Sequence, residues 1–255
     1  MKTVFQCEGS VDGIFTGVYE AWASRLGHDR VKVEILGERN LELFSRYVQV
    51  ETDHDKAEKV AKTLRNRLAG ESYRHIYQAC LCADWDRADE IYRVIVLALS
   101  GRGERHIMER LQDTHVCRVF EMSRKVSNEG HRYLGFLRFR ELKSGILFSE
   151  IHPENQVLPL IGDHFRDRYP RENFLIYDGS HETFLVHRAG ESWFLAFSSE
   201  WSEQETRILT RKEEEFQKLW QAFCTAIAIE ERKNPCLQRQ LLPLKFRSYM
   251  TEKYK

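Results

Sequence analysis

The sequence predicts an α+β protein with an N-terminal β-α-β unit and helical lobe, a mostly antiparallel central sheet, and a long C-terminal helix with a basic tail. Apolar residues recur at helical spacing through most of residues 1–125, whereas short aromatic and β-branched runs separated by glycines follow in 126–255. No internal repeat joins the two patterns. We therefore expect two regions, 1–125 and 126–255, which together could form one compact unit.

Composition narrows the class of protein before any motif is considered. The 255 residues are 42% hydrophobic and 31% charged, which is typical of a globular chain rather than a disordered or coiled-coil one. The 39 basic and 39 acidic residues cancel, so affinity for a polyanion must come from local patches. The N-terminus does not resemble a signal peptide and the longest apolar run is too short to span a bilayer, so we expect a cytoplasmic protein with no membrane partner.

The first 36 residues predict a β-α-β unit. Residues 2–6 alternate weakly as a strand, Ser10 is a good N-cap for a helix, and residues 31–36 form a second strand. A helix between two strands is compatible with parallel pairing. The helix is predicted to bury one apolar face, made by Ile14, Val18, Tyr19, Trp22 and Leu26. The glycine spacing does not match a dinucleotide-binding fingerprint.

The predicted helical lobe follows. Two amphipathic segments, 57–68 and 88–99, end at Gly70 and Gly101. A short helix over 73–80 and a later one over 116–126 complete the lobe.

The second region is predicted to contain five strands and two helices. The strands lie at 132–142, 145–151, 173–178, 183–188 and 192–197. A helix over about 157–169 separates the second strand from the third and ends at Pro170. The last long helix, at about 210–230, is predicted to bury Phe216, Leu219, Trp220, Phe223 and Ile227.

Arginines concentrate in the first of these strands, "HRYLGFLRFREL" at 131–142. On a strand, Arg132, Arg138 and Arg140 would share one face with apolar residues, a surface suited to phosphate beside stacked bases. Alternatively, these arginines pair with nearby carboxylates on an exposed sheet face. A second basic segment ends the chain. The predicted nucleic-acid-binding residues are Arg132, Tyr133, Arg138, Arg140, Lys245 and Arg247.

Three residues are candidates for catalysis. His131 could position a phosphate or protonate a leaving group, or be a structural histidine. His152 lies between Glu150 and Glu154 at a strand end, where carboxylates can orient an imidazole. Asp178 could be a catalytic carboxylate or the first residue of the turn "DGSH".

No cofactor or metal site is predicted. The acidic and histidine spacing around His152 and on the helix near His164 does not define a metal site. The six cysteines lack zinc-site spacing, and we expect mostly buried free thiols.

Three parts of the sequence also resemble a bacterial family described as probable DNA metabolism or repair proteins of unknown mechanism. They are "EGSVDGIFTGVYEAW" near the start, "EGHRYLGFLRFREL" with "VLPLIGDHFRDRYPRENFLIYD" in the middle, and "NPCLQRQLLPLKFRSYMTE" near the end. The resemblance implies a link to DNA, because similar domains occur fused to uracil-DNA-glycosylase-like domains. It also implies a partner, because stand-alone members tend to be encoded beside a radical SAM protein thought to repair or modify DNA.

These observations predict a nucleic-acid-acting accessory protein of DNA repair or metabolism that binds DNA and works with a radical SAM partner. The partner would supply iron–sulfur chemistry, because this chain lacks the clustered cysteines that hold such a cluster. One alternative is a stand-alone hydrolytic, glycosylase-like repair enzyme acting through Asp178, His152 or Glu150. The other is a protein-interaction adaptor without direct DNA contact.

Overall fold

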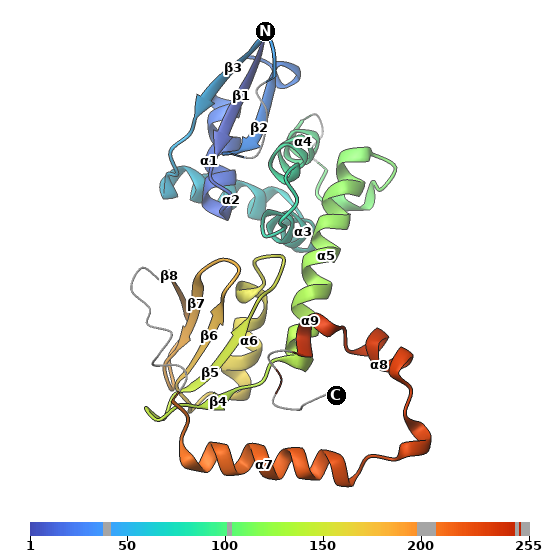
Figure 1. Ribbon diagram of the computed structural model, residues 1–255. Coiled ribbons are helices and arrows are strands. Elements are labelled where there is room, and N and C mark those ends of the chain that lie inside the picture. The colour runs from blue at the N-terminus through green and yellow to red at the C-terminus, as the bar shows by residue number, and fades with distance from the viewer. Residues whose placement is uncertain (38–41, 101–103, 198–207, 248–249, 251–255) are drawn as a thin grey trace. The chain divides into compact units, whose positions relative to one another are not determined.

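The computed structural model of the chain describes residues 1–37, 42–100, 104–197, 208–247 and 250 (Figure 1). The chain divides into two compact units, Met1–Asn128 and Glu129–Lys255. Helix α5 (Thr114–Phe136) contributes its first part to one unit and its last part to the other.

A small parallel sheet forms part of the first unit (Figure 1). Its strands β1 (Lys2–Cys7), β2 (Val31–Ile35) and β3 (Ser45–Gln49) lie in the order β2-β1-β3, and both neighbours run parallel to β1. Helix α1 (Val11–Ala23) connects β1 to β2, which confirms the predicted β-α-β unit. Ser10 caps α1 by accepting a hydrogen bond from the amide of Gly13, as predicted. The sequence pattern did not predict β3.

The predicted helical lobe is also confirmed. It contains α2 (His54–Arg67), α3 (Gly70–Cys80) and α4 (Arg87–Leu99), with 3₁₀ turns η1 (His28–Arg30) and η2 (Ile107–Glu109). Gly70 therefore begins α3 as well as following α2. The buried side chains of α2, α3 and α4 include Leu64, Ile76, Ile91 and Ile95.

Two residues of the predicted α1 face are corrected by the structure. Trp22 is 39% exposed, and Leu26 lies beyond the end of the helix and is 47% exposed. Ile14 and Val18 are buried as predicted, and Phe15, which was not in the predicted set, is almost fully buried beside them.

The prediction of a strand over 132–142 is wrong, because α5 continues to Phe136. Only Arg140–Glu141 is extended, as the short strand β4. The buried residues Val126, Tyr133 and Leu137 recur at helical spacing, and this period extends the helix through the arginine-rich segment. The alternation of arginines and aromatics that suggested a strand is therefore not a sheet-face pattern.

The second unit contains a five-stranded sheet in the order β4-β5-β6-β7-β8. Strands β5 (Leu147–Ile151) and β6 (Phe174–Asp178) are parallel and joined by α6 (Leu158–Arg168). The other pairs, which include β7 (Thr183–His187) and β8 (Phe194–Phe197), are antiparallel, so the prediction of a mostly antiparallel sheet is confirmed. Side chains of α5, α6 and the sheet share a hydrophobic core whose centre includes Ile161, Phe174, Ile176 and Leu185.

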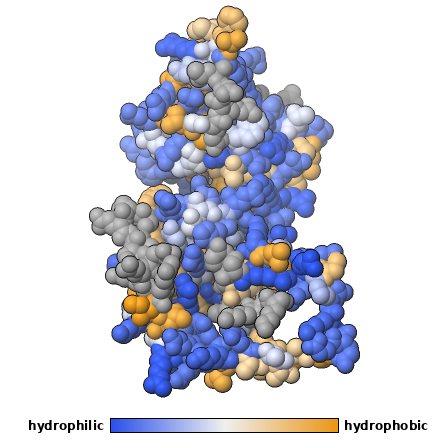
Figure 2. All heavy atoms as spheres, viewed as in Figure 1, coloured by the Kyte–Doolittle hydropathy of each residue, from blue (hydrophilic) through white to orange (hydrophobic). Residues whose placement is uncertain are grey.

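The long helix α7 (Arg211–Ala226) forms as predicted, but its apolar face is not buried among the described residues. Its large apolar side chains are between 36% and 68% exposed, and Figure 2 shows hydrophobic residues reaching the surface along this helix. The helical period predicted this helix correctly, but the period carries no information on whether another surface covers its apolar face. The corrected residues are Phe216, Leu219, Trp220, Phe223 and Ile227.

The basic tail contains the turn η4 (Glu230–Arg232) and the short helices α8 (Pro235–Leu241) and α9 (Leu244–Arg247). Leu242 and Phe246 anchor the tail in the core of the second unit, where they are 8% and 2% exposed. Among the described residues, no helix has the length and apolar character needed to cross a membrane.

Candidate functional site

The parallel pairing of β5 and β6 places the carboxyl ends of both strands at the same edge of the sheet. Ile151 is paired with Asp178 in the register, so His152 and Gly179 follow at neighbouring positions. A Cβ atom added to Gly179 would lie 2.4 Å from Cε1 of His152, which shows that the imidazole lies directly against the backbone of this turn. The structure therefore brings together two predicted catalytic residues, His152 and Asp178.

Asp178 organises the turn that follows β6. One carboxylate oxygen accepts hydrogen bonds from the amides of Ser180 and His181 at 2.9 and 3.2 Å. The other oxygen lies 2.7 Å from Nδ1 of His181. Because Asp178 is 1% exposed, its carboxylate does not present itself to solvent, and the turn interpretation of this residue fits the geometry. Any chemistry at this position would pass through His181, whose side chain is 25% exposed.

A second carboxylate–imidazole pair lies at the end of β5. Nε2 of His152 is 3.1 Å from Oε1 of Glu150, and the other oxygen of Glu150 lies 3.8 Å from the Arg140 guanidinium. Arg140 also lies over the ring of Phe148, with its guanidinium carbon 5.2 Å from the ring centre. The alternative that arginines of this segment pair with carboxylates therefore holds for Arg140. We use the name strand-end cluster for the residues Arg140, Glu150, His152, Asp178 and His181.

A buried carboxylate holds the loop that carries His152. The side chain of Glu129, on α5, is 6% exposed and accepts hydrogen bonds from the amides of Glu154 and Asn155 at 3.1 and 2.9 Å. It also accepts from the Asn155 side-chain amide and from Nζ of Lys245, each at 2.7 Å. Burial raises the pKa of Glu129, but Lys245 and the loop amides lower it by more, so the net pKa lies below its ordinary value. The loop 152–155 is thus pinned to α5 and to the C-terminal tail.

The predicted DNA-contacting residues of α5 separate into exposed and buried positions. His131 and Arg132 are exposed on the last turns of the helix. Tyr133 is 3% exposed, and its ring packs edge-on against Phe246 with 5.0 Å between ring centres. The ring of Tyr133 is therefore part of the hydrophobic core and is not available for contact with a nucleic acid base.

Two further predicted contacts bind backbone carbonyls. Arg138 donates to the carbonyls of Gly135 and Leu137 at 2.8 and 3.1 Å, where it caps the C-terminal end of α5. Arg247, on α9, donates from Nε to the carbonyl of Leu242 at 3.2 Å. The predicted DNA-contacting residues thus do not form one strand face. Arg140 is nevertheless linked to His152 through Glu150, and Lys245 is linked to the loop 152–155 through Glu129.

The geometry suits proton transfer or anion contact better than metal binding. Each of two partly exposed imidazoles, His152 and His181, has a carboxylate that can fix its orientation. In the part of the chain that the structure describes, no group of three or more histidine, cysteine or acidic side chains is arranged to hold a metal. On the helix near His164, the carboxylate of Asp163 accepts a hydrogen bond from the Trp193 indole at 2.9 Å.

Two residues of the site were missed by the sequence analysis. His181 follows Asp178 by three positions in a turn, a spacing at which an aspartate can bond both the backbone and the side chain of the later residue. Glu129 occupies a buried position of the α5 period, and an acidic residue at such a position is a signal for a specific partner. Both signals were present in the sequence.

Comparisons with known proteins supply a family but no activity. Residues 85–252 match the model of a family described as a domain of unknown function, DUF4130. No curated protein matches the chain. A solved structure described as the DHH domain of a member of a family of ribosomal proteins is similar, with 12% identity, a TM-score of 0.44 and coverage of 74% of each chain.

Proposed function

Because the chain belongs to this family of domains of unknown function, the function must be argued from the site, and we propose that the protein is a nucleic-acid-acting accessory protein of DNA repair or metabolism. In this proposal the second unit contacts DNA at the strand-end cluster. The resemblance of the sequence to DNA metabolism proteins supports the choice of DNA as the polyanion.

The observation that carries the proposal is the pairing of His152 and His181 with Glu150 and Asp178 at adjacent strand ends, beside Arg140. A carboxylate fixes the orientation of each partly exposed imidazole, so both rings are positioned for contact with an approaching phosphate. Arg140 lies 3.8 Å from Glu150, a separation at which a phosphate can compete for the guanidinium. A phosphate at this edge would therefore contact the Arg140 guanidinium and lie beside the rings of His152 and His181.

Binding of the full chain to labelled single-stranded and double-stranded oligonucleotides, measured over a range of salt concentrations, tests this proposal. Arg140→Gln should weaken binding and lower the slope of log K against log salt by about one for each lost phosphate contact. Arg132→Gln tests the exposed arginine of α5 in the same way. Arg74→Gln is a matched control, because Arg74 is exposed in the first unit and pairs with Glu71. Unchanged affinity and slope in both test variants would contradict the proposed surface.

A stand-alone hydrolytic repair enzyme is the second candidate, favoured by the Asp178–His181 contact of 2.7 Å. A buried aspartate that orients a partly exposed imidazole is an arrangement used for general acid–base catalysis. His181→Gln and His152→Gln should then abolish turnover of lesion-bearing oligonucleotides while leaving much of the binding intact. If the unaltered protein turns over no such substrate, this candidate fails.

The proposed radical SAM partner is supported by the sequence resemblance alone, and the proposed cytoplasmic location by the shortness of the longest apolar run in the sequence. Co-expression with the radical SAM protein encoded beside a close relative, followed by size-exclusion chromatography, tests the partnership. A stable complex combined with no affinity for any oligonucleotide would favour the adaptor over the DNA-binding protein.

A further inference from the structure

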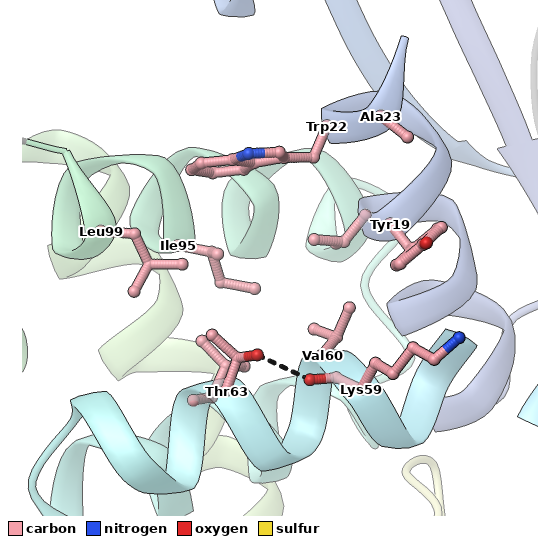
Figure 3. Close-up of a pocket in the computed structure, with 10 residues that line it drawn as sticks. Tyr19, Trp22, Ala23, Lys59, Val60, Thr63, Ile95 and Leu99 are labelled. Carbon is pink, nitrogen blue, oxygen red and sulfur yellow. Dashed lines mark hydrogen bonds between the residues drawn. The ribbon is translucent and has the colours of Figure 1, made fainter. Parts of the chain in front are cut away.

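The first unit contains a pocket of about 400 Å³ that the DNA-related proposal does not use. It opens between α1, α2 and α4 (Figure 3). This volume lies within the range of small-molecule sites, about 300–1,000 Å³. All of its lining residues belong to one unit, so the pocket does not depend on how the two units are placed.

The interior of the pocket is apolar. Val60 and Leu64 come from α2, Ile95 and Leu99 from α4, and the indole of Trp22 from α1 lies across from the α2 side chains (Figure 3). Trp22 is 39% exposed although it belongs to a well-packed helix. An indole left open to solvent as a pocket wall offers a flat apolar surface for a ligand.

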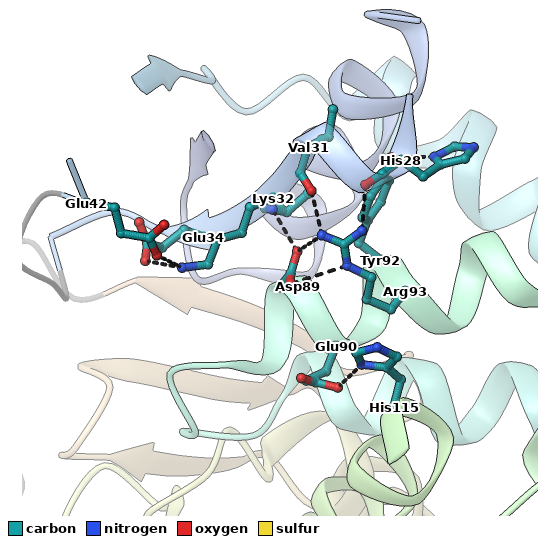
Figure 4. A network of polar contacts seen from close by, with 11 residues as sticks. His28, Val31, Lys32, Glu34, Glu42, Asp89, Glu90, Tyr92, Arg93 and His115 are labelled. Carbon is teal, nitrogen blue, oxygen red and sulfur yellow. Dashed lines mark hydrogen bonds and ion pairs between the residues drawn. The ribbon is translucent and has the colours of Figure 1, made fainter. Parts of the chain in front are cut away.

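Trp22 contacts the ring of His28. His28 belongs to a network of hydrogen bonds that includes Tyr92, Arg93 and Asp89 (Figure 4). The His28 ring lies 4.7 Å from the Trp22 ring, and Nδ1 of His28 is 2.7 Å from the hydroxyl of the buried Tyr92. The guanidinium of Arg93 donates to the carbonyl of His28 at 2.6 Å and is paired with Asp89. The wall is therefore held in place without a ligand, which lowers the entropic cost of binding.

One end of the pocket carries a positively charged side chain. Lys59 is exposed, and its Nζ lies 6.0 Å from the centre of the Tyr19 ring, so the ammonium and the phenol occupy the same end of the pocket. The hydroxyl of Thr63 donates to the Lys59 carbonyl at 2.7 Å, so its proton is already used. The ammonium of Lys59 places a positive charge at this end of the pocket, which favours an anionic group on the ligand.

We propose that this pocket binds a small amphiphile with an elongated or flat apolar body and one anionic group, such as a medium-chain or aromatic carboxylate. The apolar body lies beneath Trp22 toward Ile95 and Leu99, and the anion lies at the Lys59 and Tyr19 end. This inference is independent of DNA binding by the second unit.

Isothermal titration calorimetry of the full chain with decanoate, 1-decanol and decyltrimethylammonium tests the proposal. Decanoate should bind more tightly than the alcohol, and the cation should bind least. Lys59→Met keeps the apolar stem but removes the charge, and should weaken decanoate about threefold to fivefold while leaving decanol unchanged. Lys62→Met is the matched control, since Lys62 is exposed on the same helix but does not line the pocket.

A second pair of variants tests the location. Ala23 is exposed at the edge of the pocket, so Ala23→Phe should fill the mouth without disturbing the core and should abolish decanoate binding. Leu219→Ser on the exposed face of α7 should leave binding unchanged. Equal affinity for all three probes would overturn the anionic preference. Binding that survives Ala23→Phe, or is lost in Leu219→Ser, would overturn the assignment of the pocket, as would the absence of decanoate binding to the unaltered chain.

Discussion

Replacing Glu129 by leucine should disconnect the His152 loop from the rest of the second unit. The carboxylate accepts four hydrogen bonds, three from amide groups of Glu154 and Asn155 and one from Lys245. Leucine fills a similar volume but accepts none of them. Asn155 is 1% exposed, so its amide groups would have no access to water after the substitution.

The magnitude follows from the number of donors left without an acceptor. A buried donor that loses its partner costs about 1–3 kcal/mol, and two such donors belong to Asn155. Lys245 is 46% exposed and regains water, so its lost ion pair adds little. We expect Glu129→Leu to lower the free energy of unfolding of the second unit by about 3–5 kcal/mol. Lys245→Met leaves the three amide contacts intact but removes the counter-charge of the buried carboxylate, so it should cost about 1–3 kcal/mol, less than Glu129→Leu.

Two measurements together check this reasoning. Urea denaturation of the full chain gives the loss of stability, and amide hydrogen exchange at Glu154 and Asn155 gives the local effect. Protection at these amides should fall strongly in Glu129→Leu and only slightly in Lys245→Met. Glu121→Leu serves as a control on the same helix, because Glu121 is exposed. If Glu129→Leu costs no more than Lys245→Met, or if both amides stay protected, the carboxylate does not hold the loop.

Three further predictions concern acid, the strand-end turn and the thiols. The pKa of Glu129 in the folded protein lies below its ordinary value of 4.5. The stability that the carboxylate contributes is therefore complete at pH values above 4.5 and is lost as the pH falls through the folded-state pKa. In Glu129→Gln, the denaturation midpoint should depend less on pH in this acid range. Gly179→Ala should displace the His152 ring, because the new Cβ would lie 2.4 Å from Cε1 of that ring. We expect changed NMR chemical shifts of the His152 ring and a loss of stability of about 1–2 kcal/mol, and unchanged shifts would contradict the contact. Burial raises the pKa of the Cys7 thiol to about 12. An aromatic disulfide reagent should therefore modify the exposed Cys236 first and Cys7 only after unfolding. Equal rates of modification at Cys7 and Cys236 would be inconsistent with the burial of Cys7.

Elements with a complete local pattern were predictable from the sequence. The α1 cap at Ser10, the amphipathic helices of the lobe and the strands β5 to β8 each carry their own periodicity and end signals. The structure of the segment 131–142 was not predictable in this way, because arginine and aromatic residues alternate there as they would on a strand. The buried residues Val126, Tyr133 and Leu137 follow a helical period instead, and that period begins before the segment. The helical period determines the structure up to Phe136, because extending an existing helix is easier than starting a new element.

The site was predictable only in part, for a related reason. Position along a strand predicts that His152 and Asp178 stand at strand ends, but only the parallel pairing of β5 with β6 makes those ends adjacent. The pairing of Lys245 with Glu129 joins residues 116 positions apart, and no local pattern specifies such a partner. The arginine surface failed as a single face because α5 ends within it, so Tyr133 turns inward while Arg140 lies on a strand.

The Glu129 network also explains why the tail matters to the strand-end cluster. The loop 152–155 leaves β5 directly after Ile151, and its two amides at 154 and 155 point to a carboxylate on another element. Lys245 of the tail supplies a positive charge that favours the ionised form of Glu129. The next residue, Phe246, is buried against Tyr133, which lies on α5 as Glu129 does. Docking of α9 and the orientation of the His152 loop are therefore coupled through one buried anion. A variant that releases the tail should alter the His152 environment before it alters the sheet, because the strands retain their own backbone pairing.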